Sequence, residues 1–148
     1  MRSNFRNVFF ILALSAGVPI ALAAYDSQEH QHPAGGAHRH PQAAKMKNLV
    51  PADATSIAAG KQIFEKQCAA CHGETGKGDG KMAAQVNPKP PDLTDAEWKH
   101  GSTDGEIFLV IKDGAKNTAM KPYNSKLTTH QIWDVVNYIR SIGPAKSH

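Results

Sequence analysis

Apolar residues recur every three or four positions in several stretches between residues 51 and 143, which is the spacing of one face of an α-helix. In the first stretch, one side of the expected helix holds Ile57, Gly60, Phe64 and Cys68. The last stretch carries a broad stripe of Ile and Val from Ile132 to Ile142. The pattern predicts four helices, over about residues 55–70, 94–100, 103–114 and 128–143.

Three of these expected helices begin with a capping box, in which a Thr oxygen accepts from a backbone N–H and a Glu or Gln reaches back to the cap. The boxes are Thr94–Glu97, Thr103–Glu106 and Thr128–Gln131. Gly114 ends the third helix and Gly143–Pro144 ends the fourth, as glycine and proline commonly do. Since the sequence has no alternating strand pattern and no internal repeat, it predicts an all-α domain over residues 51–148.

Two long connections separate the expected helices. The first, from Gly73 to Pro91, contains four glycines and three prolines, and the second runs from Ala115 to Leu127. Loops of this length usually wrap a ligand or serve another function. The helices would enclose a thin core unless a large apolar group filled the middle.

The N-terminal segment has the features of a secretory signal peptide. Two arginines form a basic start, an apolar run opens at residues 8–14, and small residues at 21–23 supply a cleavage pattern. Pro19 interrupts the apolar run, which is shorter than the roughly 20 residues that span a bilayer. We expect residues 1–24 to be a signal peptide and the mature protein to lie in the periplasm without stable membrane insertion. An uncleaved anchor is the alternative.

The segment from residue 25 to residue 50 shows no helical or strand periodicity and contains several Gly and Pro residues. It also holds four of the eight histidines, namely His30, His32, His38 and His40. We expect a flexible His-rich linker. A copper, nickel or zinc site is the alternative, because imidazole binds these metals.

Composition and charge exclude several classes of protein. The chain has 148 residues, of which 41% are hydrophobic and 20% charged, and its mean hydropathy of −0.43 excludes a polytopic membrane protein. The formal net charge is +4, and it falls to +2 once Arg2 and Arg6 are removed with the signal. With no run of Lys and Arg, no nucleic-acid partner is expected. Two cysteines are too few for a disulfide-rich scaffold.

The two cysteines lie in the sequence Cys68-Ala-Ala-Cys71-His72, which is the attachment motif of haem c. Two thiols at this spacing add to the two vinyl groups of a haem, and the next residue presents its imidazole to the iron. A thioredoxin-like motif would need a βαβ context, and a structural zinc site would need four clustered ligands. A disulfide across two residues at a helix end would be strained. The motif therefore predicts one covalently attached haem c.

Residues 55–143 resemble a class I c-type cytochrome, the family of mitochondrial cytochrome c and many bacterial monohaem cytochromes. Gly60 and Phe64 resemble the positions where the family's first helix contacts its last, and Trp133 and Tyr138 lie on the expected last helix. A glycine at such a crossing lets two backbones approach closely. The resemblance implies a cytochrome c fold, with about four helices around one haem.

The resemblance also implies the second axial ligand and a partner for the first. Met120 lies where the family places its axial methionine, although Lys121 here separates it from Pro122. The other candidate ligands are Met46, Met82, His100 and His130. A ligating imidazole usually donates its other N–H to a carbonyl or carboxylate. The family uses a proline carbonyl for this, and Pro91 matches best.

A haem with His72 and Met120 as iron ligands has no open coordination position, so it exchanges electrons and does not activate a substrate. We expect a periplasmic electron carrier rather than an enzyme, either soluble or a small electron-transfer subunit of a redox complex. Its redox protein partners would bind transiently. Five lysines are expected to border the haem: Lys77, Lys81, Lys116, Lys121 and Lys126. The alternatives are a haem enzyme or gas-binding protein with a labile distal ligand, and a His-rich metal-handling protein.

Overall fold

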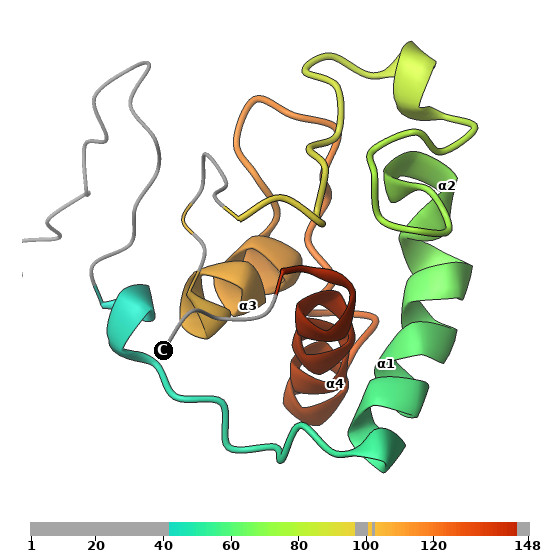
Figure 1. Ribbon diagram of the computed structural model, residues 1–148. Coiled ribbons are helices and arrows are strands. Elements are labelled where there is room, and N and C mark those ends of the chain that lie inside the picture. The colour runs from blue at the N-terminus through green and yellow to red at the C-terminus, as the bar shows by residue number, and fades with distance from the viewer. Residues whose placement is uncertain (1–41, 97–100, 102, 145–148) are drawn as a thin grey trace, which may run out of the picture. The chain divides into compact units, whose positions relative to one another are not determined.

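The structure is a computed structural model that describes residues 42–96, 101 and 103–144. Four α-helices and two short 3₁₀ helices follow one another along the chain (Figure 1): η1 (Ala43–Lys45), α1 (Ala54–Gln67), α2 (Ala69–His72), η2 (Ala83–Gln85), α3 (Asp104–Asp113) and α4 (Thr129–Ile142). Within these described ranges there is no strand. The predicted all-α class is therefore confirmed.

The N-terminal caps explain where the three longer helices begin. The predicted capping boxes at Thr103 and Thr128 are both formed, with Glu106 and Gln131 reaching back to the cap residues. The first helix begins earlier than its apolar pattern indicates, because Asp53 caps it by accepting a hydrogen bond from the backbone N–H of Ser56 at 2.9 Å. Each cap satisfies a backbone donor that the helix itself cannot.

The short helix predicted over residues 94–100 does not begin at Thr94. The backbone N–H and the hydroxyl of Thr94 both donate to the Asp92 carboxylate, at 2.8 and 2.6 Å, and residues 93–96 form turns and bends. Such local side-chain hydrogen bonds compete with helix formation. Residues 97–100 lie outside the described residues. The remaining helix is instead α2, which follows α1 after a break at Cys68.

The closest contact between long helices is the crossing of α1 and α4, which lie side by side (Figure 1). A Cβ atom at Gly60 would stand 2.0 Å from the carbonyl oxygen of Asp134, so only glycine permits this approach. Next to this contact, the rings of Phe64 and Tyr138 pack at 5.2 Å between centroids. The crossing thus uses Gly60, Phe64 and Tyr138 as the sequence indicated. Trp133, the other aromatic residue indicated on this helix, stacks on Phe108 of α3 instead.

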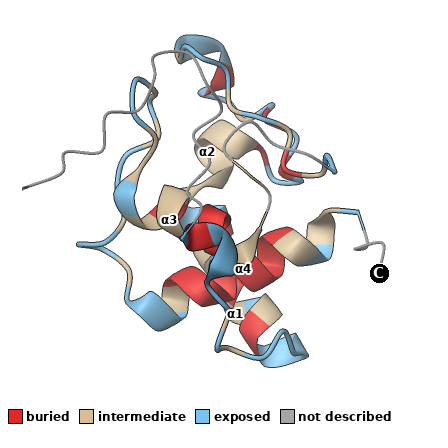
Figure 2. Cartoon of the chain, turned by 90° about the vertical axis from the view of Figure 1, so that its left-hand side faces the viewer, coloured by how far each residue is buried: buried red, intermediate tan, exposed pale blue. Residues whose placement is uncertain are grey.

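The helix α4 lies at the centre of the fold. Its residues from Ile132 to Ile139 are all buried, as the red ribbon in Figure 2 shows. Trp133 points toward α3 and stacks on Phe108 at 4.2 Å between centroids. An ion pair of 2.7 Å between Arg140 and Asp104 also joins α4 to α3. The helix α4 therefore packs against both α1 and α3.

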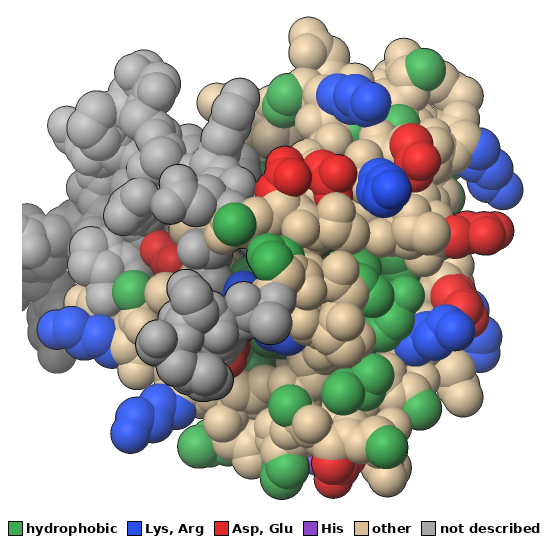
Figure 3. Space-filling model, in the orientation of Figure 1, with side chains coloured by type: hydrophobic (Ala, Val, Ile, Leu, Met, Phe, Trp, Pro, Cys, Tyr) green, Lys and Arg blue, Asp and Glu red, His purple; other side chains and the backbone are tan. Residues whose placement is uncertain are grey.

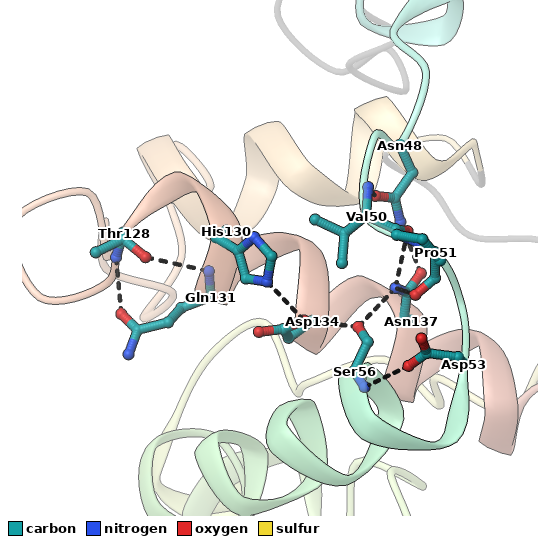
Figure 4. A network of polar contacts seen from close by, with 10 residues as sticks. All are labelled: Asn48, Val50, Pro51, Asp53, Ser56, Thr128, His130, Gln131, Asp134 and Asn137. Carbon is teal, nitrogen blue, oxygen red and sulfur yellow. Dashed lines mark hydrogen bonds and ion pairs between the residues drawn. The ribbon is translucent and has the colours of Figure 1, made fainter.

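A buried polar network crosses the same region (Figure 4). The Ser56 hydroxyl donates to the Asp134 carboxylate at 2.6 Å and accepts from the Asn137 amide at 2.8 Å. The same amide contacts the backbone carbonyls of residues 50–51, and its oxygen accepts from Asn48 at 2.6 Å. Ser56, Asp134 and Asn137 are each about 95% buried. Their hydrogen bonds to one another and to the backbone replace those that they would make with water.

The last part of the expected linker packs on the helices. Ala43 is only 1% exposed, and its carbonyl oxygen would lie 2.0 Å from a Cβ atom at Gly105 in α3. Asn48 joins the same segment to α4. Residues 42–50 therefore contact the folded domain and differ in this from a free tether. The expected signal peptide and the four linker histidines lie outside the described residues.

Candidate functional site

An apolar cavity of about 490 Å³ opens between the helices and the two long connections. It is lined from the end of α1, α2, the 86–95 connection, α3, the loop after α3, and α4. Its size falls within the range of ligand pockets, about 300–1,000 Å³. The structure brings all five predicted site residues to this one cavity: Cys68, Cys71, His72, Pro91 and Met120.

The two cysteines and His72 are presented by a single helical turn. The N–H groups of Cys71 and His72 donate to the Cys68 carbonyl at 3.1 and 2.9 Å, which closes α2 directly after the break from α1. Both cysteines are free thiols. Burial, with a smaller contribution from Cys71, raises the pKa of the Cys68 thiol from 9.0 to about 12. A redox-active dithiol has a lowered thiol pKa, and the pKa of Cys68 is shifted in the opposite direction.

The His72 imidazole has the surroundings of a neutral ligand. Burial lowers its pKa, and this favours the neutral form that binds metals. Its Nδ1 atom is buried without a hydrogen-bond partner at normal geometry. The nearby Pro91 backbone has the opposite and smaller effect, because it raises the pKa of His72. This arrangement fits a proximal ligand whose Nδ1–H faces the Pro91 carbonyl.

Met120 reaches the cavity on a loop that closes on itself directly after α3. The Met120 N–H donates to the Thr118 hydroxyl at 3.0 Å, and the Met120 carbonyl accepts from Ala115 at 3.1 Å. The loop begins at Gly114, which has a φ of 77° and lies against the Met120 carbonyl. A residue with a side chain would be strained in this conformation. The loop thus places Met120, which is partly buried, at the same cavity as His72.

The alternative ligands that the structure describes lie elsewhere. Met46 and Met82 are exposed, by 36% and 42%, and neither lines the cavity. His130 stands at the exposed start of α4, 3.7 Å from Asp134. His100 lies outside the described residues. Of the described candidates for the second ligand, the cavity therefore contains Met120 alone.

The glycine-rich connection folds back on α2. The N–H groups of Gly78 and Gly80 donate to the carbonyls of His72 and Cys71, at 2.8 and 3.2 Å, and Met82 donates to Ala70 at 2.8 Å. A Cβ atom at Gly80 would lie 2.5 Å from two α2 carbonyls. The loop satisfies carbonyls that a four-residue helix leaves without partners. It thereby holds the turn that carries the cysteines.

Tyr123 is a cavity residue that the sequence pattern did not predict. Tyr123 follows Met120 closely, and its hydroxyl donates to the carbonyl of Gln67, the last residue of α1, at 2.8 Å. Burial and the neighbouring cysteines raise its pKa. The only local signal was its position beside Pro122, and its partner in α1 could not be found by spacing.

The described residues contain no group of three or more His, Cys, Asp or Glu side chains that could hold a metal ion. In the same part of the chain, no helix is long and apolar enough to span a membrane.

A helical crossing, a Cys-Ala-Ala-Cys-His turn and an apolar cavity between two loops define a haem-binding domain of the c type. A family model described as cytochrome c matches residues 57–143, which is more than half of the chain. The chain belongs to the cytochrome c family.

Curated relatives include subunits of cbb3-type cytochrome c oxidases. The chain is 34% identical over 89 residues to the cbb3-type cytochrome c oxidase subunit FixP of Bradyrhizobium diazoefficiens, covering 60% of this chain and 28% of that protein. It is 34% identical over 99 residues to the corresponding subunit CcoP of Rhodobacter capsulatus, covering 63% and 31%. The chain thus spans less than a third of the length of these relatives.

Solved structures show the same fold. A chain of the Kuenenia stuttgartiensis reducing HAO-like protein complex aligns with a TM-score of 0.61 and 28% identity, over 67% of this chain and 50% of that one. Cytochrome cL from Hyphomicrobium denitrificans aligns with a TM-score of 0.53 and 28% identity, over 66% and 53%. These matches confirm the cytochrome c fold.

Proposed function

We propose that this chain is a periplasmic electron carrier with one haem c, bound covalently through Cys68 and Cys71 and ligated by His72 and Met120. It acts as a soluble carrier or as a small electron-transfer subunit of a redox complex. The observation that carries the proposal is that these four residues, from two distant parts of the chain, line one apolar cavity.

The residues fit the roles that a haem c would require. The two thiols lie one helical turn apart, burial lowers the pKa of His72 and so favours its neutral imidazole, and the Pro91 backbone lies near its unpartnered Nδ1. A haem c bound there would supply one-electron chemistry at its iron. The thioether of Met120 would favour a higher reduction potential than a second nitrogen ligand. The apolar wall would exclude water and raise the potential further.

Electron transfer follows from the ligand set. His72 and Met120 would both hold the iron of a bound haem and leave no coordination position for a substrate, so the haem would supply electron exchange rather than substrate transformation. The named relatives are subunits of cbb3-type oxidases, and a structural neighbour is a cytochrome cL. These similarities support redox proteins as the partners of this chain.

We propose that contact with these partners is brief and weakly steered by charge. The five lysines expected near the haem are all exposed: Lys77, Lys81, Lys116, Lys121 and Lys126. On the face shown in Figure 3, positive and negative side chains are interspersed. An acidic partner should therefore reduce the protein faster at low salt, by a modest factor. A reduction rate independent of ionic strength would contradict the steering.

The ligand set is tested by Met120→Ala. The ferric wild-type protein should show the sulfur-to-iron charge-transfer band in the red region, and the variant should lose it and have a lower reduction potential. The ferrous wild-type protein should not bind carbon monoxide at neutral pH, whereas the variant should. An unchanged band in the variant would exclude Met120 as ligand. Carbon monoxide binding by the wild type would favour a gas-binding or enzymatic role.

The periplasmic location rests on the expected signal peptide at residues 1–24. Cell fractionation followed by N-terminal sequencing of the haem-containing protein tests it. We expect a periplasmic protein that begins near residue 25, and an intact N-terminus in the membrane fraction would show that the segment is kept as an anchor.

A metal titration of the mature protein tests the His-rich linker, for which we expect no tight binding.

A further inference from the structure

Tyr123 connects the loop that carries Met120 with the turn that carries the cysteines. Its hydroxyl donates to the carbonyl of Gln67 at 2.8 Å. Gln67 is the last residue of α1, and Cys68 follows it directly. The hydrogen bond therefore ends one residue from the first thiol and begins three residues after the methionine.

The backbone of Tyr123 is fixed as well. Its N–H donates to the carbonyls of Ile111 and Lys112 at the end of α3, at 3.1 and 3.2 Å. Its own carbonyl accepts from Lys126 and Leu127, both at 2.9 Å. The hydroxyl thus extends from a residue that is anchored to α3, so its bond to Gln67 ties the end of α3 to the end of α1.

The hydroxyl also meets a need of α1. The last carbonyls of a helix have no partner within the helix. At the break between α1 and α2, the carbonyl of Gln67 accepts its hydrogen bond from a distant segment. Tyr123 lines the cavity, and the Lys126 ammonium lies 5.5 Å from the centroid of its ring. The ring and hydroxyl together form a strap beside the cavity.

We propose that Tyr123 is a positioning residue that holds the Met120 loop against the Cys68–His72 turn and so determines how firmly the methionine stays on the iron. The inference rests on the proposed His72 and Met120 ligation. Without the hydroxyl, the loop remains attached to α3 but loses its link to α1. The distance between the two ligand-bearing segments then fluctuates more, and an external ligand displaces the thioether more easily.

The test is Tyr123→Phe, assayed by titrating the ferric holoprotein with imidazole at neutral pH and following the charge-transfer band. The substitution keeps the ring, its contact with Lys126 and both sets of backbone hydrogen bonds, so the fold should be retained. One lost hydrogen bond predicts an apparent Kd for imidazole that is lower by about fivefold. The matched control is Tyr138→Phe, which removes a tyrosine hydroxyl at the helix crossing and should leave the Kd unchanged.

The outcomes separate the inference from the proposed function. If the wild-type ferric protein lacks the charge-transfer band, methionine ligation itself fails. If the band is present and both variants bind imidazole with the wild-type Kd, the positioning role of Tyr123 is wrong, even if Tyr123→Phe unfolds at lower denaturant concentration. A lowered Kd in Tyr123→Phe alone supports the strap.

Discussion

The α1–α4 crossing and the cavity wall are built in different ways. At the crossing, helix packs on helix through Gly60, aromatic rings pair, and buried polar side chains satisfy one another. The cavity wall consists largely of irregular connections, and its helical part includes α2, which has only four residues. The crossing is completed by the chain alone, whereas the wall surrounds an apolar space of about 490 Å³.

This difference indicates that the crossing and the cavity wall have different roles. The crossing supplies stability that belongs to the polypeptide, because the buried side chains of Ser56, Asp134 and Asn137 have hydrogen-bond partners within the chain. The wall would depend on the proposed haem to fill the cavity, since the residues that line an apolar cavity lack contacts on one side. Substitutions at the crossing should therefore change stability more than redox properties, and substitutions at the wall should do the reverse.

The largest effect is expected from removing both attachment thiols. In Cys68→Ala/Cys71→Ala, no thioether bond can form, so the haem should be extractable from the denatured protein, and little folded holoprotein should accumulate. The measurement is haem staining after denaturing electrophoresis. Each single variant keeps one thiol and serves as control, with haem that stays attached. Covalent haem in the double variant would disprove the attachment site.

Gly60→Ala should produce the largest effect at the crossing. The new methyl would meet the Asp134 carbonyl at 2.0 Å, so the helices must separate, at a cost of about 3 kcal/mol in the free energy of unfolding. Denaturant unfolding of the holoprotein measures this, with the exposed Gln62→Ala on the same helix as control. The reduction potential should barely move. A variant with wild-type stability and a shifted potential would contradict the proposal that the crossing determines stability and the cavity wall determines redox properties.

Asn137→Ala tests the buried network. The substitution removes the amide donor to the Ser56 hydroxyl and the acceptor of the Asn48 amide, and losing such partners in a buried network costs about 2 kcal/mol in the free energy of unfolding. Chemical denaturation provides the number, and Ser141→Ala, a change near the exposed end of α4, provides the comparison. Equal stability of the two variants would show that water replaces the network at little cost.

The smallest of these effects is expected at the helix caps. Thr103→Ala and Thr128→Ala each remove the side-chain acceptor of a capping box, which contributes about 1 kcal/mol. Both losses should appear in thermal unfolding with little change in the visible spectrum. A cap variant that loses the charge-transfer band would show that the cavity wall is more sensitive to the helices than we expect.

The features that sequence reasoning could find are local ones. The caps at Thr103 and Thr128, the apolar stripe of α4 and the Cys-Ala-Ala-Cys-His turn are each written within a few neighbouring residues. Gly60 was also recognised, through a resemblance that supplied its distant partner. The five predicted site residues do line one cavity, and their roles as ligands stay predictions.

The features that sequence reasoning missed depend on distant partners or on competition between local hydrogen bonds. Asn48 binds Asn137, which lies 89 positions away, and neither residue carries a pattern that indicates the pairing. Residues 42–50 lack helical periodicity because they pack through single contacts rather than through a helix face. At Thr94, the capping-box pattern was present, but the neighbouring Asp92 took both of its donors.

In the proposed function, one haem c with His72 and Met120 as ligands carries single electrons. The most direct test is a spectroelectrochemical titration of the mature holoprotein. We predict one reversible one-electron wave, with the sulfur-to-iron band present in the oxidised protein and lost on reduction. A ferric protein without that band, or with the high-spin spectrum of an open coordination position, would contradict the account.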